Sequence, residues 1–251
     1  MARLTEAIKH LLIINVLFFV ATSIYGDQMY EWFALHFPEN ENFKIWQIIT
    51  HMFMHGGLMH IGFNMFALWM FGSPVEQSLG KNRFLFLYFS AGLGAVLFQL
   101  GYYYINYLPL QTELLNSGLT SDEIIRMITS NRAIEGLTEG QLSKVREAFP
   151  VYRETYFASM VGASGCIMGV MAAFAVMNPE AKLMMIFLPI PIKAKYFIPG
   201  IILLDVISAI SGQSFFSPSN TAYMAHVGGA IFGFIIMWYW KRNSFNDKRW
   251  N

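Results

Sequence analysis

Seven polar side chains lie in otherwise apolar stretches of this sequence of 251 residues, namely His51, His55, His60, Asn64, Ser164, Asp205 and His226. Polar groups in a membrane environment are costly, and by default they line a cavity or a functional site. A serine and a histidine are the pair that nucleophilic acyl transfer requires, because the imidazole takes the proton of the attacking hydroxyl. Ser164 and His226 are therefore candidates for this chemistry if the fold brings them together.

The composition predicts an all-α membrane protein. Apolar residues make up 55% of the chain and charged residues only 13%, whereas about a quarter of a soluble domain is charged. Soluble enzymes, secreted mini-proteins and disordered chains are excluded on this ground. The net charge of +1 gives no sign of nucleic-acid binding, and the single cysteine, Cys166, excludes an internal disulfide and a cysteine-rich metal site.

Six uncharged apolar stretches are candidates for transmembrane helices, at residues 11–26, 57–75, 84–106, 157–178, 196–212 and 220–240. A bilayer-crossing helix needs about 17–25 residues, so the first and the fifth are marginal in length. We interpret the first as a retained span rather than a signal peptide, because no small-x-small cleavage site follows it. The proline-rich run at 183–192 is too short to cross, and we expect an interfacial segment or a loop there.

The basic residues predict that both termini lie in the cytoplasm, because this orientation divides the 17 Lys and Arg residues into 11 inside and 6 outside. The polar residues 107–156 then form an outer insert between the third and fourth spans. Within it, Thr120 with Glu123 and Thr138 with Gln141 have capping-box spacing, which predicts two short helices. The insert either packs on the outer rim of the bundle or has a substrate-docking or interfacial role.

The span boundaries place three polar residues at one depth. Ser164 lies seven residues into the fourth span and His226 six residues into the sixth, which is roughly 10 Å below the outer surface at the rise of an α-helix. Asn64 falls at the same level in the second span. A random scatter of polar residues would seldom produce this match.

Two pairs of glycines predict how the fourth and sixth spans could meet. Gly165 with Gly169, and Gly229 with Gly233, form small-xxx-small faces that let helix backbones approach closely. Such faces are common packing devices when taken alone. Beside Ser164, and at matched depth, they favour a site in which that hydroxyl reaches a histidine on the other helix.

Further histidines extend the candidate site. His60 and Asn64 are spaced i, i+4 and can donate hydrogen bonds toward one point, so with the backbone N–H of Ser164 they could form an oxyanion hole. His51 and His55 also have i, i+4 spacing, which suits a metal ligand pair. A metal site is disfavoured because the chain has no HExxH motif, and no Cys or carboxylate lies near these histidines in sequence.

With these motifs in place, the sequence resembles the rhomboid family of intramembrane serine proteases. The resemblance rests on His60-Ile61-Gly62-Phe63-Asn64, on Gly162-Ala163-Ser164-Gly165, and on Ala225-His226 with Gly229 and Gly233. It covers all six expected spans and nearly all of the chain outside the insert. It implies one rhomboid domain over residues 1–251, built as a six-transmembrane-helix bundle, which hydrolyses peptide bonds in or near transmembrane segments of other proteins.

The resemblance also implies roles for individual residues. Ser164 matches the nucleophile and His226 the general base of a dyad that has no acid partner. His60 and Asn64 match the side chains that, with the Ser164 N–H, stabilise the oxyanion. Gly162 lies in the nucleophile motif and would ease close approach of the substrate.

The remaining implications concern partners and location. His51 and His55 match a family pattern that is structural or water-organising, and no metal or organic cofactor is implied. The implied partners are the lipid bilayer and single-pass substrates that carry small residues at the cleavage site, and the oligomeric state stays open. We expect the inner membrane of a bacterium, with the active site opening to the outer side.

The sequence departs from the family pattern in two places. The usual Trp-Arg pair of the first outer loop is Trp46-Gln47, and Met168 stands where relatives often carry an aromatic residue against the catalytic histidine. Asp205 could reach His226 and complete a triad. We expect instead an interior hydrogen bond or a protonated side chain, so that Asp205→Asn keeps most activity.

Two other functions are compatible with the sequence. A catalytically silent relative would bind client helices without cutting them, but the intact Ser164 and His226 argue against it. A small transporter, or a haem- or metal-binding membrane protein, would use His51, His55 and His60. That reading leaves the matched depth of Ser164 and His226 unexplained.

Overall fold

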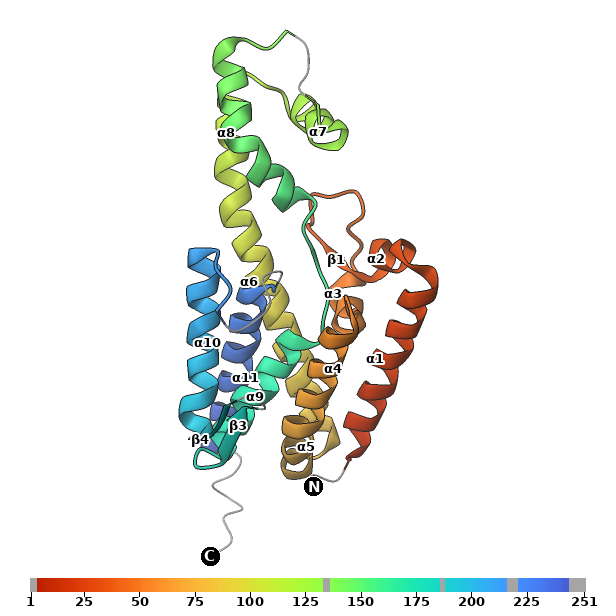
Figure 1. The fold of residues 1–251 in the computed structure, drawn as a ribbon, viewed down its shortest axis with the longest axis vertical. Coiled ribbons are helices and arrows are strands. Elements are labelled where there is room, and N and C mark those ends of the chain that lie inside the picture. Colours follow the sequence, from red (N-terminus) through yellow and green to blue (C-terminus); the bar gives the residue numbers. More distant parts are fainter. Residues whose placement is uncertain (1–3, 133–135, 186–187, 216–220, 244–251) are drawn as a thin grey trace, which may run out of the picture. The chain divides into compact units, whose positions relative to one another are not determined.

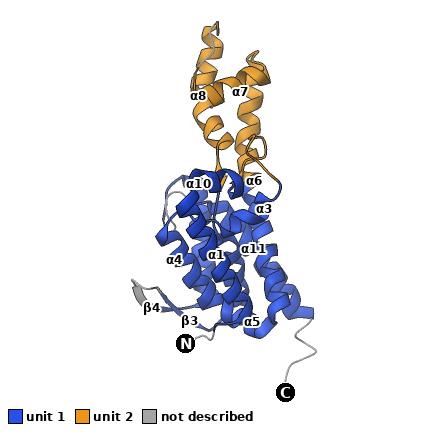
Figure 2. Ribbon diagram, turned by 90° about the vertical axis from the view of Figure 1, so that its right-hand side faces the viewer, with its two compact units in different colours: residues 1–35, 45–99, 160–251 blue, residues 36–44, 100–159 orange. Residues whose placement is uncertain are grey.

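The computed structural model describes residues 4–132, 136–185, 188–215 and 221–243. Over these ranges the protein is mostly helical and its strands are short. The chain divides into two compact units, shown in Figure 2: residues 1–35, 45–99 and 160–251 form the first, and residues 36–44 and 100–159 the second. Three basic residues that contributed to the predicted orientation, Arg3, Lys248 and Arg249, lie outside the described residues.

The first unit is built from helices that run mostly alongside one another (Figure 1). They are α1 (Glu6–Tyr25), α2 (Asp27–Phe33), α3 (Gln47–Thr50), α4 (Leu58–Ala67), α5 (Ser73–Leu79), α9 (Ser164–Met177), α10 (Ala194–Ser211) and α11 (Tyr223–Asn243), with a 3-10 turn at His51–Phe53 and a π-helical turn at Leu68–Gly72. The long helix α6 (Lys81–Asn116) contributes residues to both units. Strands β1 (Leu35–His36) and β2 (Ser159–Met160) have two residues each.

Four of the described helices are long and apolar enough to cross a membrane: α1, α6, α10 and α11. The second expected span is helical from Leu58 to Leu79, although the π-helical turn divides it into α4 and α5. α9 is apolar but has only 14 residues. The predicted helical membrane class is therefore confirmed, whereas the count of six spans stays a prediction.

The fourth expected span starts later than predicted. We placed a membrane helix over 157–178, but residues 157–163 are not helical and α9 begins at Ser164. The cause is local, because Gly162 has a φ of +128°, a backbone conformation that L-residues with side chains rarely adopt. Ser164 is thus the first residue of α9 rather than the eighth residue of a longer helix, so a depth calculated from helical rise does not apply to it.

Two further boundaries differ from the prediction. α6 continues to Asn116 through Pro109, so the insert expected from residue 107 begins inside a helix. The run at 183–192 belongs to an antiparallel hairpin of β3 (Lys182–Met185) and β4 (Leu188–Lys193).

Beside the hairpin, hydrogen bonds from the ammonium groups of Lys193 and Lys195 lower the pKa of the Glu180 carboxyl to about 2.

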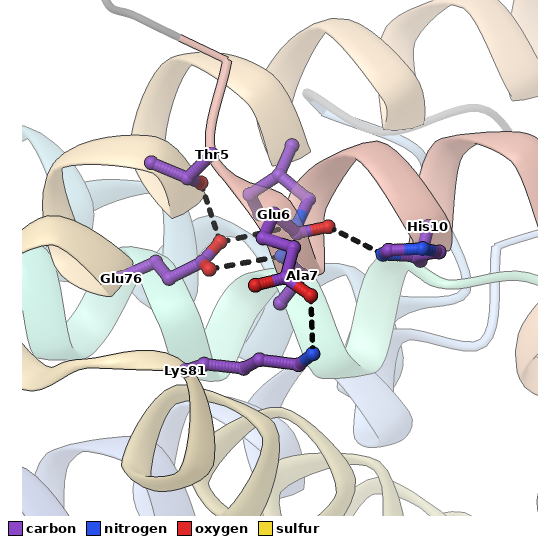
Figure 3. A network of polar contacts seen from close by, with 7 residues as sticks. Thr5, Glu6, Ala7, His10, Glu76 and Lys81 are labelled. Atoms are coloured by element: carbon purple, nitrogen blue, oxygen red, sulfur yellow. Dashed lines mark hydrogen bonds and ion pairs between the residues drawn. The ribbon is translucent and has the colours of Figure 1, made fainter.

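A buried carboxylate fixes the first helix to the end of the second expected span. Glu76 on α5 accepts hydrogen bonds from the backbone N–H groups of Ala7 at 2.9 Å and Ile8 at 3.1 Å, and from the hydroxyl of Thr5 (Figure 3). The first N–H groups of a helix have no partner within the helix. Glu76 therefore caps α1 from another element.

The second unit contains the two helices that the insert was predicted to form. They are α7 (Ser121–Ser130) and α8 (Glu139–Tyr156). Both predicted capping boxes are present, with the Thr120 and Thr138 side chains each accepting from the backbone N–H three residues on. The unit has its own apolar core, in which the rings of Tyr107 and Tyr152 stack at 4.4 Å and their hydroxyls lie 2.6 Å apart.

Candidate active site

Ser164 and His226 are in hydrogen-bond contact. The Ser164 Oγ lies 2.9 Å from the His226 Nε2. Ser164 is the first residue of α9, and His226 is in the first turn of α11. A hydroxyl at this distance from an imidazole nitrogen is placed to give up its proton to that nitrogen.

Four glycines allow α9 and α11 to come this close. A Cβ on Gly229 would meet the backbone carbonyl of Gly165, and a Cβ on Gly233 would meet that of Gly169. Each glycine thus lies at a point of direct backbone contact, as the small-xxx-small spacing predicts. A larger residue at Gly229 or Gly233 would push the two helices apart.

The other imidazole nitrogen of His226 faces a carboxylate. The Asp205 Oδ2 on α10 lies 2.8 Å from the His226 Nδ1, and the Asp205 side chain is only 1% exposed. When the Nδ1–H donates to this carboxylate, the Nε2 carries the lone pair that faces Ser164. Asp205 thus makes the contact with His226 that the sequence analysis considered but did not favour, and the expectation that Asp205→Asn keeps most activity no longer has its basis.

His60 on α4 lies against the loop that precedes the serine. Its Nδ1 accepts a hydrogen bond from the backbone N–H of Gly56 at 3.3 Å, so the proton of the neutral ring lies on Nε2. A Cβ on Gly162 would stand 2.8 Å from this Nε2 and 3.7 Å from the Ser164 Oγ. The His60 Nε2–H donor thus lies against Gly162, two residues before the serine, and glycine is required for that approach.

The other two candidate oxyanion donors are the Asn64 side chain and the backbone N–H of Ser164. The Asn64 side chain is buried, and its Nδ2 has no hydrogen-bond partner among the residues that the structure describes. The first intrahelical bond of α9 runs from the Ile167 N–H to the Ala163 carbonyl. The N–H groups of the first turn, Ser164 included, therefore have no partner within the helix, and they stand at its positive end.

His51 and His55 contact residues of the candidate site. The His51 Nδ1 lies 2.7 Å from the Gln47 carbonyl, and the His51 carbonyl accepts from the Gly162 N–H at 2.9 Å. The His55 ring packs edge-on against His60 at 4.9 Å between centroids. Burial lowers the pKa of both His51 and His55 to about 4. The described residues hold no cluster of three or more metal-ligating side chains.

The two departures from the family pattern have different surroundings. The Gln47 side chain is buried and its Nε2 donates to the carbonyls of Glu31 at 3.0 Å and Trp32 at 3.5 Å, while the Trp46 Nε1 also donates to Trp32 at 2.9 Å. A neutral amide thus ties this loop to the end of α2 without an arginine. Met168 is buried in the apolar core of the first unit.

One supporting residue escaped the sequence analysis. The Gln99 side chain on α6 is buried, and its Oε1 accepts from the backbone N–H of Ala225 at 3.2 Å. The same N–H also donates to the Ala222 carbonyl at 3.0 Å, so Gln99 adds a second acceptor in the first turn of α11, directly before His226. The signal was available, because an uncharged amide within an apolar span is itself a mark of a buried polar contact.

Comparison with known proteins matches the chain to the rhomboid domain family over residues 42–110 and 134–243. Proteins named Rhomboid protease GlpG from Salmonella newport, Salmonella heidelberg and Salmonella typhimurium are each 41% identical to it over 71 residues, which is 28% of this chain and 26% of each relative. The chain thus spans about a quarter of the length of the curated relatives it matches. With its long apolar helices the protein is an integral membrane protein. Since the family match extends over most of the sequence, the chain belongs to the rhomboid family.

Proposed function

We propose that this protein is an intramembrane serine endopeptidase, which cleaves peptide bonds in or near the transmembrane segments of other membrane proteins. The observation that carries the proposal is the 2.9 Å contact between the Ser164 Oγ and the His226 Nε2. Membership of the rhomboid family and the curated relatives named rhomboid protease support it. In this proposal Ser164 is the nucleophile and His226 the general base.

The reaction begins with proton transfer. The His226 Nε2 takes the hydroxyl proton of Ser164 as the Oγ attacks the carbonyl carbon of the scissile peptide bond. The carbonyl π bond opens, and its electron pair moves to the oxygen. The product of this step is a tetrahedral intermediate with a negative oxygen and a protonated imidazole.

Three donors stabilise that oxygen. They are the Ser164 backbone N–H at the start of α9, the His60 Nε2–H and the Asn64 Nδ2–H. The unpartnered amide of Asn64 supports this assignment, because a donor reserved for the transition state is left without a partner before substrate binds. Removal of one such donor in another serine protease raises the barrier by about 2.7–4 kcal/mol.

The remaining steps return the enzyme to its starting state. The His226 imidazolium donates its proton to the leaving amine, the peptide C–N bond breaks, and an ester to Ser164 remains. The imidazole then takes a proton from a water molecule, whose oxygen attacks the ester carbonyl. Collapse of this second intermediate breaks the ester bond, returns the proton to the Ser164 Oγ and releases the carboxylic acid.

We further propose one rhomboid domain with six spans, both termini inside, the insert outside, and a location in the inner membrane of a bacterium. Several basic residues lie at one end of these helices. Lys182 follows the C-terminal end of α9, Lys193 and Lys195 flank the start of α10, and Lys241 lies in the last turn of α11. Ser164 and His226 lie at the opposite, N-terminal ends of α9 and α11. By the positive-inside rule the site therefore opens outward, where water is available for the second step.

The experiment that tests the function is cleavage of a transmembrane reporter. The full-length protein is purified in detergent, reconstituted into liposomes and incubated with a panel of single-span reporter proteins that carry small residues at the outer end of the span. We expect cleavage by the wild type and none by Ser164→Ala or His226→Ala. Capture of reporters by a folded wild type that never cuts them would favour the silent relative.

A further inference from the structure

We propose that Asp205 is a positioning residue of the active site, which fixes His226 for proton transfer and extends the serine–histidine pair to a serine–histidine–aspartate triad. This inference rests on the proposed function. The resemblance to the family implies a dyad without an acid partner. The carboxylate on α10 is therefore a feature of this chain that the resemblance does not supply.

Three side chains from three helices are linked by two consecutive hydrogen-bond contacts. The Asp205 Oδ2 lies 2.8 Å from the His226 Nδ1, and the His226 Nε2 lies 2.9 Å from the Ser164 Oγ. Both ring nitrogens are thus engaged, one by an acceptor and the other by a donor. The imidazole cannot flip about its ring axis without losing both contacts.

Burial strengthens the hydrogen bond between Asp205 and His226. Asp205 is 1% exposed and His226 is 8% exposed. A buried carboxylate requires hydrogen-bond donors, and the Nδ1–H of His226 is one that the site provides. In a low-dielectric interior such a charge-assisted bond is stronger than it would be in water.

The contact acts on catalysis in two ways. It keeps the proton of the neutral ring on Nδ1, so that Nε2 is free to accept the Ser164 proton. Once that proton has moved, the imidazolium stands beside the negative charge of Asp205, which stabilises the ion pair formed in the transition state. Asp205 itself takes no proton in either step.

The residue at position 168 explains why this chain needs such a contact. The resemblance places an aromatic ring against the histidine at this position, but here the residue is Met168. A flexible thioether gives a weakly directional surface. In this chain, orientation of His226 comes instead from the carboxylate on α10.

A purely structural role, in which the carboxylate only ties α10 to α11, predicts different behaviour. Asp205→Asn keeps the size and a polar group at the site, but its amide can donate to Nδ1 and so favours the wrong tautomer. The matched control is Ser208→Ala, because Ser208 is also buried on α10 and its Oγ donates to the Leu204 carbonyl of the same helix. Asp205→Glu tests whether a carboxylate in nearly the same place restores function.

The experiment compares these variants with the wild type in the full-length, detergent-solubilised protein. For Asp205→Asn we expect kcat to fall about 10²–10⁴-fold with KM nearly unchanged. We expect partial recovery in Asp205→Glu, wild-type kinetics in Ser208→Ala, and a melting temperature close to wild type in all three. The Nδ1–H of His226 should give a far-downfield proton resonance in the wild type and in Ser164→Ala, which is lost in Asp205→Asn.

The outcomes separate the two proposals. If the wild type cleaves and Asp205→Asn keeps its kcat, the positioning role is wrong while the proteolytic function stands. If the wild type neither cleaves nor reacts with a serine-directed probe, the proposed function fails, and the downfield resonance still tests the Asp205 contact. If Asp205→Asn does not fold, the Asp205→Glu kinetics and the Ser164→Ala spectrum decide the question.

Discussion

Gly162 and His60 touch although they are far apart in sequence: a Cβ at position 162 would stand 2.8 Å from the imidazole Nε2 of His60. The φ of Gly162 is also +128°. Two independent constraints, the close contact with His60 and the positive φ, therefore require glycine at position 162, two residues before the start of α9. The glycine thereby determines both where α9 starts and how close His60 comes to the serine.

Gly162→Ala should lower both activity and stability. We expect the free energy of unfolding to fall by about 1–3 kcal/mol from backbone strain. Reporter cleavage should be abolished, because the His60 ring is displaced. The control is Gly200→Ala on α10, where a Cβ meets nothing within 4 Å and both properties should be kept. Equal cleavage by the two alanine variants would contradict the account.

Asn64→Leu should separate activity from stability. The Nδ2 of Asn64 makes no hydrogen bond within the described residues, so an apolar side chain of similar size removes an unsatisfied buried group. We expect kcat to drop about 10²–10³-fold with KM little changed and the melting temperature equal or higher. Kinetics on a cleavable reporter and a thermal melt check this. A variant that loses stability and keeps its kcat would remove Asn64 from the oxyanion hole.

Acid should destabilise the protein through His51 and His55. Burial lowers both pKa values to about 4, below the unfolded value of about 6.5. The unfolded chain therefore binds more protons between these values. The stabilisation is complete above about pH 6.5 and is lost as the pH falls toward 4.

Melting temperatures recorded from pH 7 to pH 4 test this. We expect a steep fall in the wild type and a shallower one in His55→Gln. Replacement of the exposed His10 by Gln is the matched control and should follow the wild type. Parallel curves for all three proteins would show that the buried histidine does not carry the pH dependence.

Glu76→Ala should loosen α1. The carboxylate accepts from the N–H groups of Ala7 and Ile8, and its loss leaves these donors without that partner. We expect a decrease of about 1–3 kcal/mol in the free energy of unfolding, with faster hydrogen exchange in the first turn of α1. Glu6→Gln, which only breaks an exposed ion pair with Lys81, should change neither. Unchanged exchange in Glu76→Ala would rule out the capping role.

Local signals in the sequence predicted a substantial part of this structure. The capping boxes at Thr120 and Thr138 mark the two helices of the insert because each depends on residues only three apart. The glycine pairs on α9 and α11 predicted a close approach because i, i+4 spacing defines one face of a helix. These features depend on little beyond the helix that contains them.

Features that depend on distant residues were not predictable in the same way. The start of α9 depends on Gly162, whose N–H is held by the carbonyl of His51 more than 100 residues earlier in the chain. The contact of Asp205 with His226 depends on the rotation of α10 about its own axis. Hydropathy locates a span but does not define that rotation, so the sequence left the triad open.

Covalent labelling tests the central claim most directly, because it needs no knowledge of the substrate. The full-length protein in detergent is treated with a fluorophosphonate probe, and the modified residue is located by peptide mass spectrometry. The account predicts one adduct, on Ser164, in the wild type and its loss in His226→Ala. A folded wild type that stays unlabelled, or a His226→Ala variant that labels equally fast, would contradict the activation of Ser164 by His226.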